Sequence, residues 1–221
     1  MTHGLDVAIL GAGGFGREVL QYSQDARAAG WPNRVVGFID NWSGAFERFD
    51  VSVPLLGSFG DIGQIDVRAF IIAVGDPALR RKLADAVVDF RGILVSLIHP
   101  TAYVAPTAQI GSGTVLCPYT LIAANSWVGP NVAVNVYASI GHDSRVGGHC
   151  VISPYAAVTG AVSLGDGSFL GTHCTIAPAV AIGACSKVSA GSVVTRDAEA
   201  GSLLIGNPAK GRVMYPLSGS G

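Results

Sequence analysis

The second half of the chain places an imidazole directly beside a carboxylate, a combination suited to proton transfer near neutral pH. The segment 140–143 reads Ile-Gly-His-Asp, so His142 is followed at once by Asp143. An imidazole can accept a proton from an attacking amine or hydroxyl, and a neighbouring carboxylate can orient its ring. The pair predicts a general base. The alternative is a structural hydrogen bond between subunits, without catalysis.

A six-residue repeat determines what surrounds this pair. From Ile98 to Val194 every sixth residue is aliphatic over seventeen repeats, and a small residue follows four places after each. One short strand per repeat, with its aliphatic side chain pointing inward, is typical of a parallel β-helix. Three repeats form one triangular coil of eighteen residues, and stacked coils lie ~4.8 Å apart.

The register of the coils predicts a second group beside the imidazole. Gly160 comes eighteen residues after His142, so its backbone is expected about 5 Å away on the same corner. A free N–H there can stabilise an oxyanion while the imidazole takes a proton, and acyl transfer requires these two groups together. The other coil histidines, His149 and His173, fall on two different corners, so three histidines cannot converge within one subunit.

The first part of the chain has a different pattern. Strand–helix alternation over residues 5–97 predicts a small α/β domain with a parallel sheet. A glycine loop that matches G-x-G-x-x-G lies between a strand at Val7–Leu10 and a helix from Arg17 to about Ala29. The loop amides and the helix N-terminus can hold a diphosphate. The loop residues are Gly11, Gly13, Gly14, Phe15 and Gly16.

Acidic residues follow two later strands of this domain. Asp40 ends the strand 35–39, where a carboxylate can reach a ribose hydroxyl. Gly75 and Asp76 follow the strand 69–74. Taken alone, the loop motif suggests NAD, or a glycine turn that binds no ligand. About ninety residues are few for a full dinucleotide fold, so a nucleotide attached to another group fits better.

Charge is scarce on the repeats. Between positions 98 and 194 the charged residues are only Asp143, Arg145, Asp166 and Lys187. A solvated prism normally carries more charge. Its faces are therefore expected to be covered by copies of the same chain, and an odd-sided prism suits a homotrimer.

Composition limits the partners and the compartment. The formal net charge of −1 favours neither nucleic acid nor an anionic membrane as a partner. No apolar run approaches the ~18 residues of a membrane span. The four cysteines show no zinc-binding spacing and are read as reduced thiols of a cytoplasmic protein.

These features together resemble one family. The resemblance rests on the glycine loop, the His142-Asp143 pair, the hexapeptides, and four further segments: Ala73–Asp76, Arg80-Arg81, His99-Pro100 and Ile205–Lys210. The chain resembles the bacterial hexapeptide-repeat sugar acyltransferases with an N-terminal nucleotide-sugar-binding domain. These include N-acetyltransferases of nucleotide-linked amino sugars and sialic acid O-acetyltransferase-like proteins. The resemblance implies a left-handed coil, acetyl-CoA as co-substrate and a nucleotide-linked amino sugar as acceptor.

The resemblance also implies roles for single residues. His142 is the general base, Asn135 and the amide of Gly160 line the acetyl-CoA site, and CoA lies between two subunits. The chain departs from some members at Phe15 and Val151, where they have histidines, which leaves the sugar open. The cations that can meet the CoA phosphates near the end of the coil are Lys187, Arg196, Lys210 and Arg212.

We therefore expect a Rossmann-like nucleotide-sugar-binding domain at 1–97, a left-handed β-helix acyltransferase domain at 98–206, and a C-terminal cap and tail at 207–221. The expected activity is acetyl-CoA-dependent N-acetylation of a nucleotide-linked amino sugar by direct attack on the thioester, without a metal. Three alternatives stay open: O-acetylation of a sugar hydroxyl, a nucleotide-sugar-binding scaffold without activity, and, remotely, a γ-type carbonic anhydrase.

Overall fold

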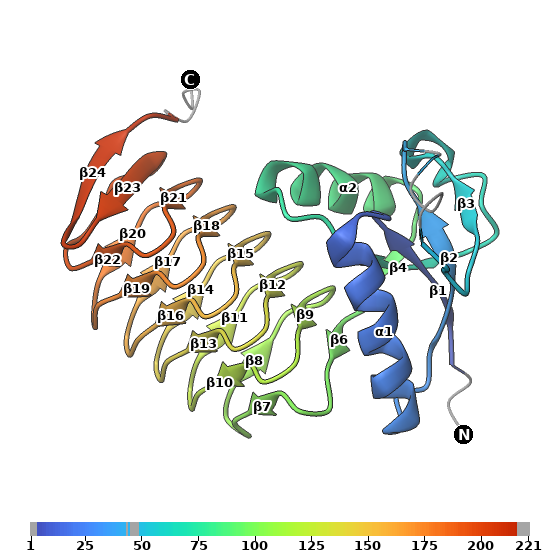
Figure 1. Ribbon diagram of the computed structural model, residues 1–221, viewed down its shortest axis with the longest axis horizontal. Helices are drawn as coiled ribbons and strands as arrows, with labels where there is room; N and C mark the ends of the chain where they lie inside the picture. The colour runs from blue at the N-terminus through green and yellow to red at the C-terminus, as the bar shows by residue number, and fades with distance from the viewer. Residues whose placement is uncertain (1–3, 43, 45–48, 216–221) are drawn as a thin grey trace.

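The computed structural model of the chain describes residues 4–42, 44 and 49–215. Residues 1–3 and the last part, 216–221, of the expected C-terminal cap and tail at 207–221 lie outside the described residues. Figure 1 shows two parts: an α/β domain that contains the N-terminus, and a long coil that ends in a hairpin.

The N-terminal domain is a five-stranded parallel sheet with the strand order β3-β2-β1-β4-β5. The central strand β1 is buried over Val7–Leu10, as expected for a parallel strand that is covered on both faces. The strands are β1 Asp6–Leu10, β2 Arg34–Ile39, β3 Leu55–Gly57, β4 Ala69–Ile72 and β5 Ile93–Leu94. The helices are α1 Gly14–Ala28 and α2 Pro77–Asp89, with a short 3-10 turn η1 at Phe59–Asp61.

The coil is a prism with three parallel sheets, which we call faces 1, 2 and 3. Face 1 contains β6 Leu97–Ile98, β9 Val115–Leu116, β12 Ala133–Val134, β15 Val151–Ile152, β18 Phe169–Leu170 and β21 Lys187–Val188. Face 2 contains β7 Tyr103–Val104, β10 Leu121–Ile122, β13 Ser139–Ile140, β16 Ala157–Val158, β19 Thr175–Ile176 and β22 Val193–Val194. Face 3 contains β8 Gln109–Ile110, β11 Trp127–Val128, β14 Arg145–Val146, β17 Ser163–Leu164 and β20 Ala181–Ile182.

Three corners connect the faces. Corner A leads from face 1 to face 2, corner B from face 2 to face 3, and corner C from face 3 back to face 1. The last coil ends in an antiparallel hairpin, whose strand β23, Ser202–Gly206, continues face 1 beside β21 and pairs with β24, Ala209–Val213.

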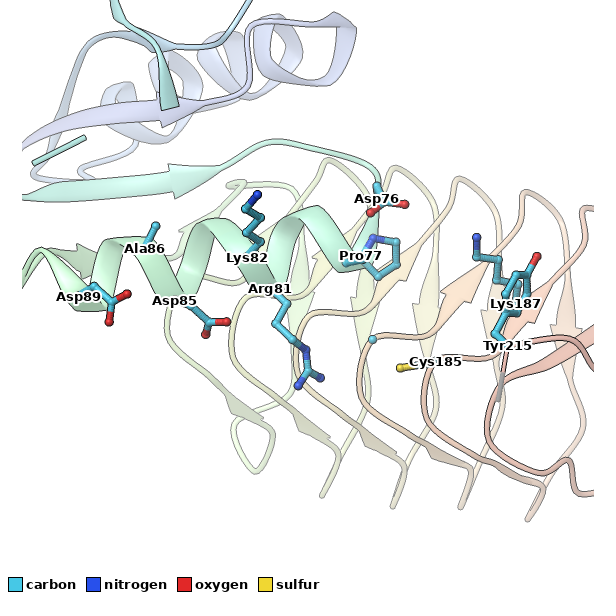
Figure 2. A pocket seen from close by; sticks show the side chains of 12 residues that line it. Asp76, Pro77, Arg81, Lys82, Asp85, Ala86, Asp89, Cys185, Lys187 and Tyr215 are labelled. Carbon is cyan, nitrogen blue, oxygen red and sulfur yellow. The ribbon is translucent and has the colours of Figure 1, made fainter. Parts of the chain in front are cut away.

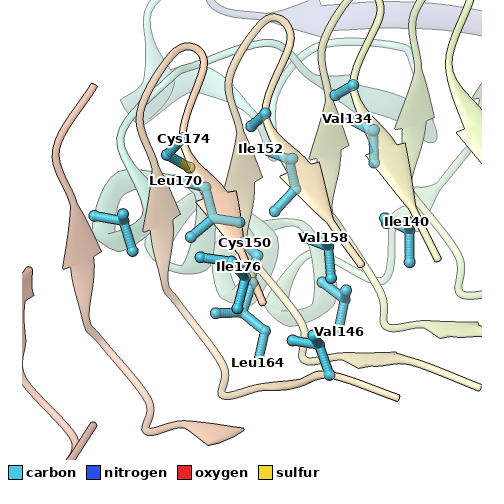
Figure 3. Packing of buried hydrophobic residues seen from close by; sticks show 14 of the residues in the cluster. Val134, Ile140, Val146, Cys150, Ile152, Val158, Leu164, Leu170, Cys174 and Ile176 are labelled. Carbon is cyan, nitrogen blue, oxygen red and sulfur yellow. The ribbon is translucent and has the colours of Figure 1, made fainter. Parts of the chain in front are cut away.

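The inward aliphatic residues form the core that the repeat predicts. From Leu116 to Val194 every one of them is buried, and Cys150 and Cys174 occupy small inward positions among them (Figure 3). The first coil differs, because Ile98 is 41% exposed. No coil precedes it, so its inner side chain has a neighbour on one side only.

The N-terminal domain docks on face 1 and corner C. One buried cluster joins β1 and α1 to the outward side chains of Leu97 and Val115 on face 1. The chain passes from the domain to the coil at this junction, where β5 belongs to the domain sheet and β6 to the coil. One face of the prism is therefore covered, over its first coils, by the same chain rather than by a second copy.

Candidate active site

His142 lies on corner B, between β13 and β14, with 69% of its side chain exposed. Its Nδ1 is 2.8 Å from Oδ2 of Asp143. A carboxylate only accepts hydrogen bonds, so Nδ1 carries the proton of the neutral ring and Nε2 is the nitrogen that can accept another. The imidazole is thereby held in the tautomer that a general base needs.

A third residue, Asn125, completes this arrangement. Its Nδ2 donates a hydrogen bond of 3.2 Å to Oδ1 of Asp143, so each oxygen of the carboxylate has one partner. The hydrogen bonds from His142 and Asn125 hold the pKa of Asp143 below its usual value, which keeps this group ionised at neutral pH. Asn125 did not emerge from the sequence, although it lies eighteen residues before Asp143 and therefore one coil away on the same corner.

Gly160 lies against the imidazole. A methyl group at this position would be 2.6 Å from Nε2 of His142, so any larger residue would displace the imidazole from where it lies. The Gly160 carbonyl accepts a hydrogen bond from Ala179 at 3.0 Å, whereas its N–H donates none within the described part of the chain. The structure thus brings together an exposed basic nitrogen and an unused backbone donor.

Asn135, the other residue expected to line the acetyl-CoA site, lies on corner A. Its Nδ2 donates a hydrogen bond of 3.0 Å to the carbonyl of Ile152. Corner A and corner B are different edges of the prism, so one chain does not place Asn135 beside His142.

The glycines of the nucleotide loop have two different functions in the structure. Gly11 has a φ of +110°, and a side chain on Gly16 would overlap the Gly11 carbonyl, so these two allow the strand–helix turn to close. Methyl groups at Gly13, Gly14 and Gly75 would meet nothing within 4 Å. Gly13 and Gly14 leave open space at the N-terminus of α1, where a diphosphate can approach, and Gly75 precedes the N-cap of α2.

Both predicted carboxylates of this domain already bind backbone amides. Asp40 accepts hydrogen bonds from the N–H of Ala12 at 2.7 Å and from the N–H of Trp42 at 2.9 Å. Asp76 is the N-cap of α2 and accepts from the N–H of Leu79 at 2.8 Å. Asp40 therefore fixes the shape of the glycine loop, and Asp76 begins the helix.

A buried arginine positions the turn that contains Gly75. Arg80 is fully buried and donates hydrogen bonds to the carbonyls of Ile72 and Val74, at 2.8 and 3.1 Å, and to Asn131 on corner C. Burial lowers the pKa of Arg80 to about 9, so it remains charged at neutral pH. This charge links the nucleotide domain to the coil, a contact that the sequence did not reveal.

Phe15 is partly buried and packs against the cluster that joins the domain to face 1. His142 lies on corner B, the edge of the prism opposite face 1. The glycine loop and the imidazole of one chain are therefore on opposite sides of the coil.

The four cations expected to meet the CoA phosphates separate into two places. Lys187 lies on face 1, with its Nζ 4.8 Å from the centre of the Tyr215 ring, and lines a cavity of about 660 Å³ beside α2 (Figure 2). The other three, Arg196, Lys210 and Arg212, line a cavity of about 500 Å³ at the end of the coil.

The histidines of the coil are distributed as the repeat predicts. His142, His149 and His173 follow strands of faces 2, 3 and 1. Within residues 4–42, 44 and 49–215 no three His, Cys, Asp or Glu side chains are grouped to hold a metal. None of the helices in these ranges is sufficiently long and apolar to span a bilayer.

Family models match both parts of the chain. The PglD N-terminal domain matches residues 6–87, and the hexapeptide repeat of succinyl-transferase matches residues 161–196. The expected fold class, a small α/β domain followed by a left-handed parallel β-helix, is confirmed by the solved structures that the chain resembles.

Two of these structures cover nearly the whole chain. PerB from Caulobacter crescentus, in complex with CoA and GDP-perosamine, is 33% identical with a TM-score of 0.82, over 94% of this chain and 97% of that one. The acetyltransferase domain of PglB from Neisseria gonorrhoeae FA1090, in complex with acetyl coenzyme A, is 29% identical with a TM-score of 0.83, over 94% and 98%.

A curated relative is matched over a shorter length. The GDP-perosamine N-acetyltransferase of Escherichia coli O157:H7 is 25% identical over 140 residues, which is 63% of this chain and 63% of that protein. The match thus spans less than two thirds of this relative. From the family models and the near-complete match to PerB, the chain belongs to the bacterial hexapeptide-repeat sugar acyltransferases with an N-terminal nucleotide-sugar-binding domain.

Proposed function

We propose that this chain transfers an acetyl group from acetyl-CoA to the amino group of a nucleotide-linked amino sugar. The observation that carries the proposal is the juxtaposition on corner B, where the imidazole of His142 lies against Gly160, whose N–H donates no hydrogen bond within the described part of the chain. The names of the relatives support the substrate classes: PerB binds CoA and GDP-perosamine, and the E. coli relative is an N-acetyltransferase. These names favour transfer of the acetyl group to an amino nitrogen over transfer to a hydroxyl oxygen.

The geometry suits direct attack on the thioester. The sugar amine attacks the thioester carbon while Nε2 of His142 takes its proton, and Asp143 stabilises the resulting imidazolium through Nδ1. The Gly160 N–H donates to the oxyanion that develops on the thioester oxygen. Collapse of the tetrahedral intermediate forms the amide and expels the CoA thiolate, which can take the proton from the imidazolium.

The complete site requires more than one chain. The nucleotide domain covers the first coils of face 1, whereas His142 lies on the opposite corner, so a sugar held at the glycine loop meets the imidazole of a different subunit. Large apolar side chains remain exposed on face 2, where Tyr103 is 59% and Leu121 is 43% exposed. We assign a homotrimer in which CoA lies between two subunits, with Asn135 of one facing His142 of the next.

The donor, acetyl-CoA, and the four free cysteines favour a cytoplasmic location, which cell fractionation tests.

Release of CoA tests the activity. The purified chain is supplied with acetyl-CoA and, in turn, with UDP-, GDP-, CMP- and dTDP-linked amino sugars, while free thiol is measured. We expect thiol release with at least one amino sugar and none with its hydroxy analogue. Release with the hydroxy analogue alone would show O-acetylation, and release with none, despite binding of the nucleotide sugar, would show a binding scaffold.

A further inference from the structure

The nucleotide domain contains a fully buried arginine whose charge meets no carboxylate. The Arg80 guanidinium donates hydrogen bonds to the carbonyls of Ile72, Val74 and Asn131 and to Oδ1 of Asn131. No ion pair includes Arg80 in the part of the chain that the structure describes. A buried charge without a counter-ion is costly. The carbonyl dipoles offset part of this cost, and an anion bound nearby would offset more.

The end of the sheet explains where this guanidinium lies. Val95 donates its N–H to the carbonyl of Phe70 at 2.9 Å, and no strand lies beside β4 after that point on this side. The next two carbonyls on the same side belong to Ile72 and Val74, and Nη1 of Arg80 binds both, at 2.8 and 3.1 Å. Arg80 therefore fixes the orientation of the peptide groups that follow these two residues.

The opposite side of this segment presents N–H groups. In a trans peptide the N–H points away from the C=O, so the N–H groups of Ala73 and Gly75 face away from Arg80. The Ala73 N–H donates to the carbonyl of Leu10 on β1 at 2.8 Å. The Gly75 N–H is next in register, but it donates no hydrogen bond within the described residues, because β1 has ended and Gly11, with a φ of +110°, turns the chain away.

This unused N–H lies at the edge of the sheet where the glycine loop begins. A methyl group on Gly11 would be 2.7 Å from the carbonyl oxygen of Ala73, so the turns that follow β1 and β4 are in contact. Gly75 is exposed, and a methyl group there would meet nothing within 4 Å, as at Gly13 and Gly14. The Gly75 N–H is therefore accessible to a ligand that approaches the N-terminus of α1.

The charges at this edge suit a buried cation. The carboxylates of Asp40 and Asp76 follow the same strands and repel an anion. Arg17 opposes them from a partly exposed position, with its Cζ 3.7 Å from the centre of the Phe49 ring. Salt screens a buried charge less than an exposed one. Arg80 therefore offsets the two carboxylates more effectively for an anion bound at this edge.

We propose that Arg80 is a positioning residue for the nucleotide-linked sugar, because it holds the Gly75 N–H toward the diphosphate of that substrate. The assignment rests on the proposed function, which supplies the substrate. The hydrogen bond from Arg80 to the Val74 carbonyl polarises the peptide and makes the Gly75 N–H a stronger donor. Donation from this N–H to a phosphate oxygen is charge-assisted. Arg80 is buried behind the turn and does not touch the reacting atoms, so its effect is on binding.

Calorimetry with UDP, GDP and dTDP, and with uridine, guanosine and thymidine, separates this role from a general effect on the domain. We expect Arg80→Met to weaken binding of the nucleoside diphosphate about ten- to a hundredfold, the weight of one hydrogen bond to a charged group. Binding of the matching nucleoside should change less than about twofold. Arg80→Lys should recover part of the affinity, because an ammonium group can still donate to the Val74 carbonyl.

Two matched variants control for other roles of this region. Arg81 lies on the same helix but lines the cavity of Figure 2, so Arg81→Met should bind the diphosphate like the wild type. Asn131→Gly removes the amide that joins Arg80 to corner C, at a residue whose φ of 53° suits glycine. It should lower the melting temperature and change diphosphate affinity less than about twofold.

A backbone substitution tests the N–H itself and leaves Arg80 in place. Glycolic acid in place of Gly75, introduced by nonsense suppression, converts the amide into an ester and removes this donor. The chain should keep its melting temperature, because the N–H makes no hydrogen bond within the described residues. It should lose about as much diphosphate affinity as Arg80→Met, and the two changes together should lose little more, since both act on one hydrogen bond.

Three results would overturn the assignment: unchanged diphosphate affinity in the ester chain, an equal loss for nucleoside and diphosphate in Arg80→Met, or an equal loss in Asn131→Gly. If Arg80→Met does not fold, the ester chain decides alone. A wild-type chain that binds none of the three diphosphates and releases no thiol would overturn the proposed function as well. Normal acetyl transfer by the wild type, with diphosphate affinity unchanged in the ester chain, would overturn only the role of Arg80.

Discussion

Corner B and the glycine loop hold their functional groups in different ways. On corner B the groups are exposed side chains on a stacked backbone: His142 is oriented by Asp143, which Asn125 binds in turn. In the glycine loop the groups are backbone amides, and the side chains around them, Asp40 and Arg80, serve to hold the chain. In the proposed function, the first arrangement moves a proton and the second binds the diphosphate. Substitutions at corner B should therefore change kcat, and substitutions in the loop should change KM.

The largest effect is expected for the base. His142→Ala should lower kcat by about 10²–10⁴, the usual weight of a general base, with little change in either KM. Steady-state kinetics with both substrates measure this. His149→Ala serves as the control on a different corner and should retain most of kcat. A His142→Ala enzyme with near-normal kcat would mean that another group, or water, takes the proton.

In the loop the expected effect is on binding. Gly13→Val adds a side chain where a methyl group meets nothing within 4 Å, so the chain should fold while the side chain blocks the diphosphate. KM for the nucleotide sugar should rise about tenfold or more, a loss of at least ~1.4 kcal/mol of binding, and KM for acetyl-CoA should stay the same. Gly16→Val is the contrasting variant, since it overlaps the Gly11 carbonyl and should prevent folding. A change in KM for acetyl-CoA with Gly13→Val would contradict the separation of the two regions.

Substitution of Asp143 should lower kcat less than substitution of His142. Asp143→Ala removes the acceptor of the Nδ1 hydrogen bond, so the ring is free to turn and to take the wrong tautomer. We expect Asp143→Ala to lower kcat about ten- to a hundredfold. Asp143→Asn should lower kcat by nearly as much, because an amide oxygen retains the hydrogen bond but not the charge. A loss equal to that of His142→Ala would indicate that Asp143 takes part in the proton transfer directly.

Asn125 should have the smallest effect. Asn125→Ala removes one neutral donor from Asp143 in an exposed position, and one such hydrogen bond is worth about 1 kcal/mol, or roughly fivefold in rate. The pKa of Asp143 should rise toward its ordinary value, because Asn125 is one cause of its depression. Titration of the carboxyl group by NMR measures this shift, and an unchanged pKa would show that the hydrogen bond is absent in solution.

The coil and the domain also differ in how far their sites follow from sequence. On the coil, a period of eighteen residues gives the neighbours of each corner residue, so Gly160 could be placed beside His142 by counting, and Asn125 was accessible in the same way. The exposure of Ile98 could not be predicted, because a repeat does not show where stacking begins. In the domain, the roles of Asp40, Asp76 and Arg80 depend on contacts between segments far apart in sequence, which local motifs do not encode.

The central claim is that one subunit supplies the glycine loop and another supplies His142. Mixed trimers of Gly13→Val and His142→Ala chains, formed by coexpression, test it most directly. The His142→Ala chain retains a normal glycine loop, and the Gly13→Val chain retains a normal His142. If loop and base come from different subunits, a site that combines these two normal groups is intact. Random mixing in equal amounts then restores about a quarter of the wild-type sites. If both groups come from one chain, every site carries a defect, and activity no higher than that of the two separate variants would contradict the account.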